Sequence, residues 1–359
     1  MNPHCECPAA GFCQRHKLEK SQREFELCKG IAHTNDCGRK YWLAWEQGAI
    51  GATRPEQPIL NPEPFCIHEN RGMGDALTRV INGVTFGMIP QCGGCKDREA
   101  LLNHWMPSKD PPPPIEPVDL TNATRHLMFH LWPVHGTGVW QWHCDQLLAN
   151  AELFNGRRIV SIVTDSQSDG AAAVQDRLKG FTDEFIILPN DPKLREVVTW
   201  VPMLERLETL NGPQDITFSG QAKGTRRPIS EADTDTIYRW TKAMWDVCLS
   251  RPDEITKHLA TKAMVGAFRR FQSKRSGWGP WHFSGTFFWF RNRDVFRRNW
   301  RYVTQKWWGT EAWPGTIFGA DDVACIFGDN CGDLYDRKYW DLEIERQLQE
   351  WITQHANAG

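Results

Sequence analysis

Basic side chains follow an apolar run in the second half of the chain. The segment SGQAKGTRRP (219–228) carries Lys223, Arg226 and Arg227 among two glycines, at the end of the run DITFSG (215–220). Cations on a glycine-containing loop after a strand are suited to binding a diphosphate. A solvated basic loop would show the same residues, and both interpretations stay open.

A carboxylate ends another apolar run. Asp165 closes the run IVSIVTD, and a carboxylate at the end of a strand can bind the ribose or the base of a nucleotide. Asp169, four residues later, could act in the same way. The alternative for either residue is a structural one, in which the aspartate caps a helix or closes a turn.

The aromatic run HFSGTFFWF, which begins at His282, is typical of a buried strand but opens with polar residues. We expect Phe287 and Trp289 to fill the core. His282, Ser284 and Gly285 would then present polar groups and exposed backbone to a ligand such as a sugar. A glycine suits that place if the ligand and the chain approach each other closely.

Cysteines are concentrated at the front of the chain, with eight of the twelve before residue 100. A C-x-x-C pair with small residues between the thiols can bind one zinc ion. The sequence therefore predicts a structural zinc site in a cysteine-rich module, while buried free thiols and redox or iron–sulfur chemistry remain as alternatives. The candidate ligands are Cys5, Cys7, Cys13, His16, Cys92 and Cys95.

The elements that must position these residues follow from hydrophobic periodicity. The proline-rich segment 108–118 predicts a linker between a module at 1–107 and a domain at 119–359. In that domain, strands and helices alternate and predict a mostly parallel, Rossmann-like α/β sheet, with ligands beyond the carboxyl ends of its strands. We expect strands at 126–132, 157–165, 184–188 and 215–220, and helices at 140–154, 170–180, within 192–210, at 231–250, 253–272 and 337–355.

Composition limits the possible function classes. The chain has 359 residues, 40% of them hydrophobic, so it can bury a substantial core. It contains no apolar stretch long enough to span a membrane and no signal segment, which predicts a cytoplasmic protein. A net charge of −2 makes nucleic acid an unfavourable partner. The 18 tryptophans suit a large core, a sugar-stacking surface or a base-stacking platform.

From about residue 126 to residue 331 the chain resembles bacterial and phage glycosyltransferases with an A-type, Rossmann-like nucleotide-sugar domain. The resemblance is carried by HLMFHLWPV, LFNGRRIVSIVTD, the K-G of QAKGTRR, WHFSGTFFWFRNRDVF and TEAWPGTIF, in this order. It implies transfer of a sugar from a nucleoside-diphosphate sugar to a glycan or another hydroxyl acceptor. It also implies that the site includes Lys223, His282, Ser284, Gly285, Glu311 and Trp313.

An inverting transferase needs a general base that takes the proton of the acceptor hydroxyl. Glu311 is the first candidate, and Asp322 follows it, together with its neighbour Asp321 in GADDVACIF. A surface or capping role is the alternative for each of them.

The chain departs from the family at one point that matters for the mechanism. Many A-type enzymes bind Mn²⁺ or Mg²⁺ with Asp-x-Asp after a core strand, whereas this chain has Ser219, Gln221 and Lys223 there. This argues against an oxygen-ligated metal. Lys223, Arg226 and Arg227 would then neutralise the departing diphosphate.

Two other functions remain compatible with the sequence. The front cysteines, the tryptophans and local arginine runs would suit a zinc-stapled nucleic-acid-binding or phage-associated module. A catalytically silent relative that binds sugars or a protein partner would keep the same fold.

Overall fold

The computed structural model describes two separate parts of the chain. The described residues are 11–13, 18–20, 112–231, 235–271 and 279–356. The chain divides into compact units at 1–111 and 112–359, and the division falls within the proline-rich segment of the sequence. In the first unit, β1 (Gly11–Cys13) pairs antiparallel with β2 (Leu18–Lys20). Of the predicted zinc ligands, Cys13 ends β1; the other five lie outside the described residues: Cys5, Cys7, His16, Cys92 and Cys95.

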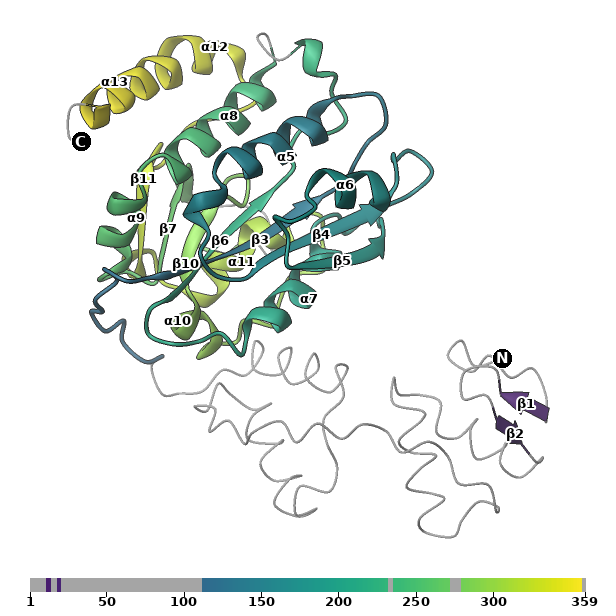
Figure 1. The fold of residues 1–359 in the computed structure, drawn as a ribbon. Coiled ribbons are helices and arrows are strands. Elements are labelled where there is room, and N and C mark those ends of the chain that lie inside the picture. Colours follow the sequence, from purple (N-terminus) through teal and green to yellow (C-terminus); the bar gives the residue numbers. More distant parts are fainter. Residues whose placement is uncertain (1–10, 14–17, 21–111, 232–234, 272–278, 357–359) are drawn as a thin grey trace. The chain divides into compact units, whose positions relative to one another are not determined.

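A seven-stranded sheet forms the centre of the second unit (Figure 1), in the order β11-β7-β10-β6-β3-β4-β5. All neighbours pair in parallel except at β10, which runs antiparallel to β6 and β7. The mostly parallel, Rossmann-like α/β fold predicted from the sequence is therefore confirmed. The strands are β3 (Thr124–Leu131), β4 (Arg158–Thr164), β5 (Glu184–Pro189), β6 (Asp215–Gln221), β7 (Met264–Ala267), β10 (Phe288–Arg291) and β11 (Val323–Phe327).

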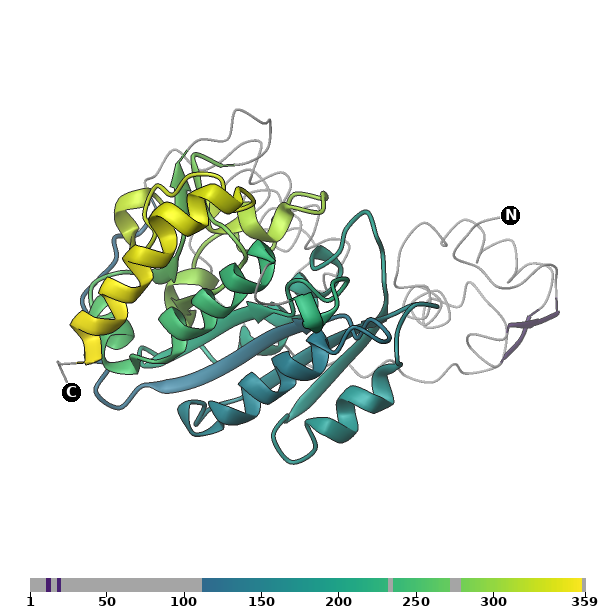
Figure 2. The ribbon, with the colours of Figure 1, turned by 90° about the horizontal axis from the view of Figure 1, so that it is seen from above.

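Helices cover both faces of this sheet (Figure 1). One face carries α5 (Val139–Ala149), α6 (Ala171–Arg177), α8 (Thr236–Leu249) and α9 (Pro252–Leu259). The other carries α7 (Val197–Leu207), α10 (Asn292–Phe296) and α11 (Gly309–Ile317). The chain closes with α12 (Arg337–Tyr339), a π-helical turn (Trp340–Ile344) and α13 (Glu345–Ala356), which lies along α8 (Figure 2).

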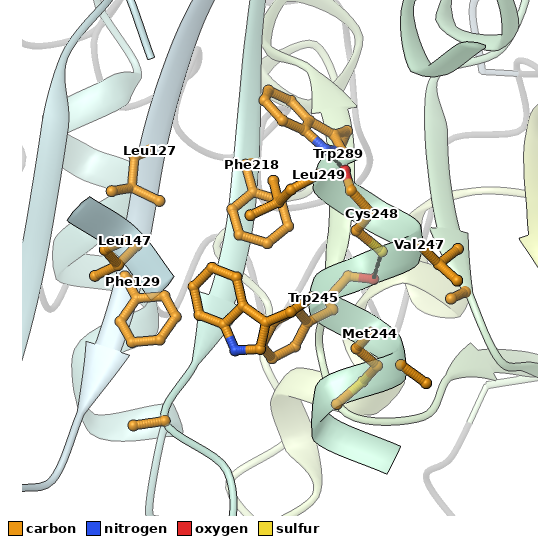
Figure 3. Packing of buried hydrophobic residues seen from close by; sticks show 14 of the residues in the cluster. Leu127, Phe129, Leu147, Phe218, Met244, Trp245, Val247, Cys248, Leu249 and Trp289 are labelled. Carbon is orange, nitrogen blue, oxygen red and sulfur yellow. Dashed lines mark hydrogen bonds between the residues drawn. The ribbon is translucent and has the colours of Figure 1, made fainter. Parts of the chain in front are cut away.

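The two faces of the sheet fill two hydrophobic clusters, because successive side chains of a strand point to opposite sides. Phe129 of β3 belongs to the cluster under α5 and α8, while its neighbour Met128 belongs to the cluster under α7 and α11. Figure 3 shows the first cluster, where Phe218 of β6 packs against both Trp245 of α8 and Trp289 of β10. Burying each such side chain contributes about 1.5–3 kcal/mol, so the sheet is held from both sides.

Two predicted elements are wrong. The helix expected at 253–272 ends at Leu259, and the chain then forms β7 and β8 (Arg269–Phe271). All four residues of β7 are buried between β10 and β11, so this strand has no alternating pattern that would distinguish it from a buried helix. The aromatic run is also not one strand, because β9 (Trp281–Phe283) pairs with β8 and a turn separates it from β10.

Strand direction defines two edges of the sheet. We call the edge where β3, β4, β5, β6 and β7 end the carboxyl edge, and the opposite one the amino edge. Because β10 runs antiparallel, it begins at the carboxyl edge, with Phe288 opposite Ser219 and Gly266. In the described part of the chain no helix is both long and apolar enough to cross a membrane.

Candidate functional site

A lysine and a glutamate lie together at the carboxyl edge. Lys223 follows β6, and its Nζ is 3.9 Å from Oε1 of Glu311, which belongs to the first turn of α11. The same Nζ lies 4.0 Å from the ring centroid of Trp240, a distance that permits a cation–π interaction. Both side chains remain partly exposed, Lys223 at 14% and Glu311 at 17%. The pair can therefore meet a ligand that approaches this edge.

The Gly285 peptide connects the carboxylate to the end of β6. The backbone N–H of Gly285 donates to Oε1 of Glu311 at 3.0 Å, and its carbonyl accepts from Nε2 of Gln221 at 3.1 Å. Gln221 is buried and thus fixes the orientation of the peptide. The predicted strand opening at Gly285 is a turn, and this turn positions Glu311 through a backbone hydrogen bond.

The structure gives a different reason for glycine at position 285 than the sequence suggested. Gly285 has φ of 98°, and a Cβ atom there would lie 2.6 Å from Sδ of Met244. Backbone conformation and a packed core side chain thus both require glycine, without any ligand.

Lys223 is held by its backbone as well as by its ring contact. His143 of α5 is buried, and its Nδ1 accepts from Nε1 of Trp245 at 3.2 Å. Its Nε2 therefore carries the proton and donates to the carbonyl oxygen of Lys223 at 3.0 Å. Burial lowers the pKa of His143 to about 4, so the ring is neutral at physiological pH.

Glu196 is a site residue that sequence reasoning missed. It stands immediately before α7, after Arg195, whose φ of 52° is positive. Burial raises the pKa of Glu196 to about 7; its own backbone N–H and the charge of Lys223 lower it, and the charge of Glu311 raises it. The charges of both members of the Lys223–Glu311 pair therefore act on Glu196. Nothing in the run PKLREVVTWVPMLERLETL marks this glutamate among the others.

Asp165 lies at the carboxyl edge as predicted, among polar groups from four strand ends. Its Oδ1 accepts from Nε1 of Trp132 at 3.3 Å, and its Oδ2 accepts from Nδ2 of Asn190 at 2.7 Å. Burial raises the pKa of Asp165. These two hydrogen bonds, a third from the backbone N–H of Gln167 and the charge of Arg226 outweigh burial, so the pKa of Asp165 is lowered overall. The guanidinium of Arg226 lies 4.7 Å from the Trp132 ring centroid, so a cation, a ring and a carboxylate come together.

Asp169 has a structural role next to this group. Its Oδ1 is hydrogen-bonded to Nδ1 of His135, and its Oδ2 accepts from Nε1 of Trp140 at 2.8 Å. The backbone N–H of Asp169 donates to the carbonyl of Pro133. These bonds join the loop after β3 to the loop after β4.

His282 and Ser284 are buried residues next to the turn at Gly285. Nε2 of His282 is 3.4 Å from Oγ of Ser284, whose N–H donates to the carbonyl of Phe268. Burial, assisted by the charge of Arg270, lowers the pKa of His282 to about 4. The structure thus brings these residues near Gly285, but their small exposure gives a ligand little direct access.

Two predicted site residues are not brought together with the others. Trp313 is completely buried, its Nε1 donates to the carbonyl of Trp300, and it packs on Trp200, so it belongs to the core. Asp322 stands before β11 at the amino edge, where its Oδ2 accepts from the Gly319 N–H. The whole length of the strands separates it from Lys223.

The described residues offer no metal site. They hold no group of three or more histidine, cysteine, aspartate or glutamate side chains arranged to bind an ion. At the end of β6, Ser219 and Gln221 are buried where an Asp-x-Asp pair would lie, and Lys223 brings a positive charge. This residue set does not fit Mn²⁺ or Mg²⁺, which need several oxygen ligands of negative or neutral charge.

The loop that begins at Lys223 leaves little closed space. A cavity of about 10 Å³ is lined by Lys223, Gly224, Arg227, Asp235 and Tyr238 among others, which is room for roughly one water molecule. A larger hollow of about 340 Å³ lies between α8 and α13, and Lys223 does not line it.

Comparison with known proteins gives weak similarities of overall arrangement. A 4-diphosphocytidyl-2C-methyl-D-erythritol synthase superposes with a TM-score of 0.33 and 12% identity, over 64% of this chain and 99% of that one. A putative nucleotide-diphospho-sugar transferase from Desulfovibrio desulfuricans G20 gives 0.31 and 10%, over 66% and 96%. The mannosyltransferase Ktr4p from S. cerevisiae gives 0.29 and 6%, over 64% and 77%. No protein-family model and no curated protein sequence matches the chain, so the function must be argued from the site.

Proposed function

We propose that this chain is a glycosyltransferase that moves a sugar from a nucleoside-diphosphate sugar to a hydroxyl acceptor. The observation that carries the proposal is the Lys223–Glu311 pair on the carboxyl edge, 3.9 Å apart and held by the Gly285 peptide. One cation for a departing diphosphate and one carboxylate for an acceptor proton are the two charges that such a transfer needs.

The group around Asp165 would bind the nucleotide. Its carboxylate and the amide of Asn190 can bond a ribose or a base, and the indole of Trp132 offers a ring beside them. Arg226, on the loop that also carries Lys223, places a second cation close to this ring. The two cations would share the diphosphate, which supports a mechanism without a catalytic Mn²⁺ or Mg²⁺.

Glu311 would act as the base. In an inverting reaction the acceptor oxygen attacks the anomeric carbon of the donor sugar while the bond to the diphosphate oxygen breaks. The proton of the hydroxyl passes to Glu311, and the charge on the leaving diphosphate is neutralised by Lys223 and Arg226. His282, Ser284 and Gly285 would fix the geometry of the carboxylate through the turn. A cytoplasmic location and a hexosyl donor agree with this proposal.

Donor binding is the first test. The full-length chain is mixed with UDP-, GDP-, CMP- and dTDP-sugars, with and without Mn²⁺, and its melting temperature is recorded. A ligand that binds the native state raises the stability. We expect one donor class to raise the melting temperature equally with and without metal. No shift with any donor would contradict the proposal.

Turnover then tests the site. The rate of nucleoside diphosphate release should fall about 100-fold in Lys223→Ala. In other enzymes, removal of one group that stabilises charge in the transition state has an effect of this size. The matched control is Lys257→Ala, an exposed lysine of α9 far from the carboxyl edge, and it should keep the full rate. Equal rates in the two variants would remove Lys223 from the site, and release of pyrophosphate instead would indicate nucleotidyl transfer.

A further inference from the structure

Two segments far apart in the sequence meet beside the Lys223–Glu311 pair. A Cβ atom on Gly309 would lie 3.1 Å from Cγ2 of Val197, so the first turn of α11 touches the first turn of α7. Trp307 precedes that turn of α11, and Glu196 precedes that turn of α7. The junction therefore gathers side chains from both segments near Glu311.

Trp307 is an exposed ring at this junction. Its exposure of 41% contrasts with that of four tryptophans on the α7 and α11 face that are buried, Trp200, Trp281, Trp300 and Trp313. The guanidinium of Arg195 lies 4.8 Å from its ring centroid, which holds the ring in place. An indole that is fixed and open to solvent gives a flat apolar surface for a ligand.

Glu196 adds a polar group at the same junction, immediately before α7. It is the residue after Arg195, and the charges of Lys223 and Glu311 both act on it. Glu196 as a residue is partly exposed, although the protein around its carboxyl group raises the pKa of that group. A hydroxyl group bound here would lie between a ring surface and a hydrogen-bonding carboxyl group.

We propose that Arg195, Glu196 and Trp307 form the acceptor subsite and that it takes a neutral carbohydrate. The apolar face of a pyranose would lie on Trp307, and its hydroxyl groups would bond to Glu196 and point toward Glu311. Arg195 and Lys223 balance the charges of Glu196 and Glu311, so the group has no large net charge that would select an ionic acceptor. This subsite rests on the proposed transferase function, and it names the acceptor class that the Lys223–Glu311 pair serves.

The subsite is tested first by binding without turnover. Neutral gluco-, galacto- and manno-oligosaccharides, and a uronic acid oligomer for comparison, are titrated into the full-length chain and followed by saturation-transfer NMR. We expect one neutral series to bind, Trp307→Ala to weaken it by about 10-fold or more, and Trp307→Phe to keep part of the affinity. The matched control is Phe271→Ala, since Phe271 is 39% exposed and capped by Arg269 at 4.9 Å.

Turnover separates the subsite from the transferase proposal. Trp307→Ala should raise the acceptor KM about 10-fold, while hydrolysis of the donor by water and donor binding stay at the wild-type level. Glu196→Gln should raise the acceptor KM and flatten the pH dependence of that KM near pH 7. The charged groups that act on Glu196 are Arg195, Lys223 and Glu311. If no nucleotide-sugar donor binds, the transferase proposal is wrong even where oligosaccharides bind. If no oligosaccharide binds, or if Trp307→Ala leaves oligosaccharide binding unchanged, the subsite proposal is wrong.

Discussion

The two edges of the central sheet both carry charged side chains, but they use them differently. At the amino edge, Nε of Arg291 lies 2.6 Å from Oδ2 of Asp294, and the two side chains are only 3% and 5% exposed. At the carboxyl edge, Lys223 and Glu311 are 3.9 Å apart and remain open to solvent. The first pair is closed within the fold, whereas the second is positioned by the fold and left accessible. Accessibility at a fixed position, rather than charge, distinguishes a candidate site from a structural ion pair.

The amino edge should respond to mutation through stability. Asp294→Ala leaves the Arg291 guanidinium buried without its partner, and breaking a buried pair in this way costs about 3–5 kcal/mol. We expect the urea midpoint of the second unit to fall accordingly, while the turnover of the molecules that remain folded is unchanged. If Asp294→Ala lost activity without losing stability, the distinction between the two edges would be wrong.

The carboxyl edge should respond through catalysis. Glu311→Gln keeps the hydrogen bond from Gly285 but removes the base, so transfer should fall by about 100-fold or more while donor binding remains. The matched change at the amino edge is Asp322→Asn, which keeps the bond from Gly319 and should alter the rate by less than about two-fold. Steady-state rates and melting temperatures of both variants check this. A larger loss in Asp322→Asn than in Glu311→Gln would reverse the assignment.

The charge of Glu196 should reduce stability at high pH. Its pKa is raised to about 7 in the folded chain, from an ordinary value near 4.5, so the fold favours the protonated form. Stability from this group is complete below about pH 4.5 and is lost as the pH rises through 7. Glu196→Gln should therefore gain about 1–2 kcal/mol over the wild type at pH 8 and almost nothing at pH 5. Thermal unfolding at the two pH values measures the difference, and an equal gain at both would exclude a titrating Glu196.

Periodicity located most of the elements that build the carboxyl edge. The strands expected at 157–165 and 215–220 correspond to β4 and β6, and Asp165 and Lys223 follow their ends as predicted. The helix expected at 253–272 failed because β7 is buried on both sides, where local sequence pattern carries little information. The turn at Gly285 was missed because its positive φ depends on contacts with α8.

The exposure of individual tryptophans could likewise not be predicted from the local sequence. The sequence favoured Trp313 for ligand binding, yet the packing of α11 on α7 buries Trp313 and leaves Trp307 exposed. Rotation of α11 about its own axis would bury a different set of side chains, and residue types alone do not encode that rotation. Glu196 was overlooked for a related reason, because only its neighbours in space alter its pKa.

The sequence by itself determined the alternation of strands and helices, the strand end that Asp165 follows and the charged loop after β6. These features depend on side-chain periodicity and chain order, which are local properties. The tertiary structure decided which carboxylate meets Lys223, that Asp322 lies at the other edge, and which tryptophan stays open. The physical reason is that exposure, desolvation and charge coupling arise between residues that are distant in sequence and become neighbours only when the helices pack on the sheet.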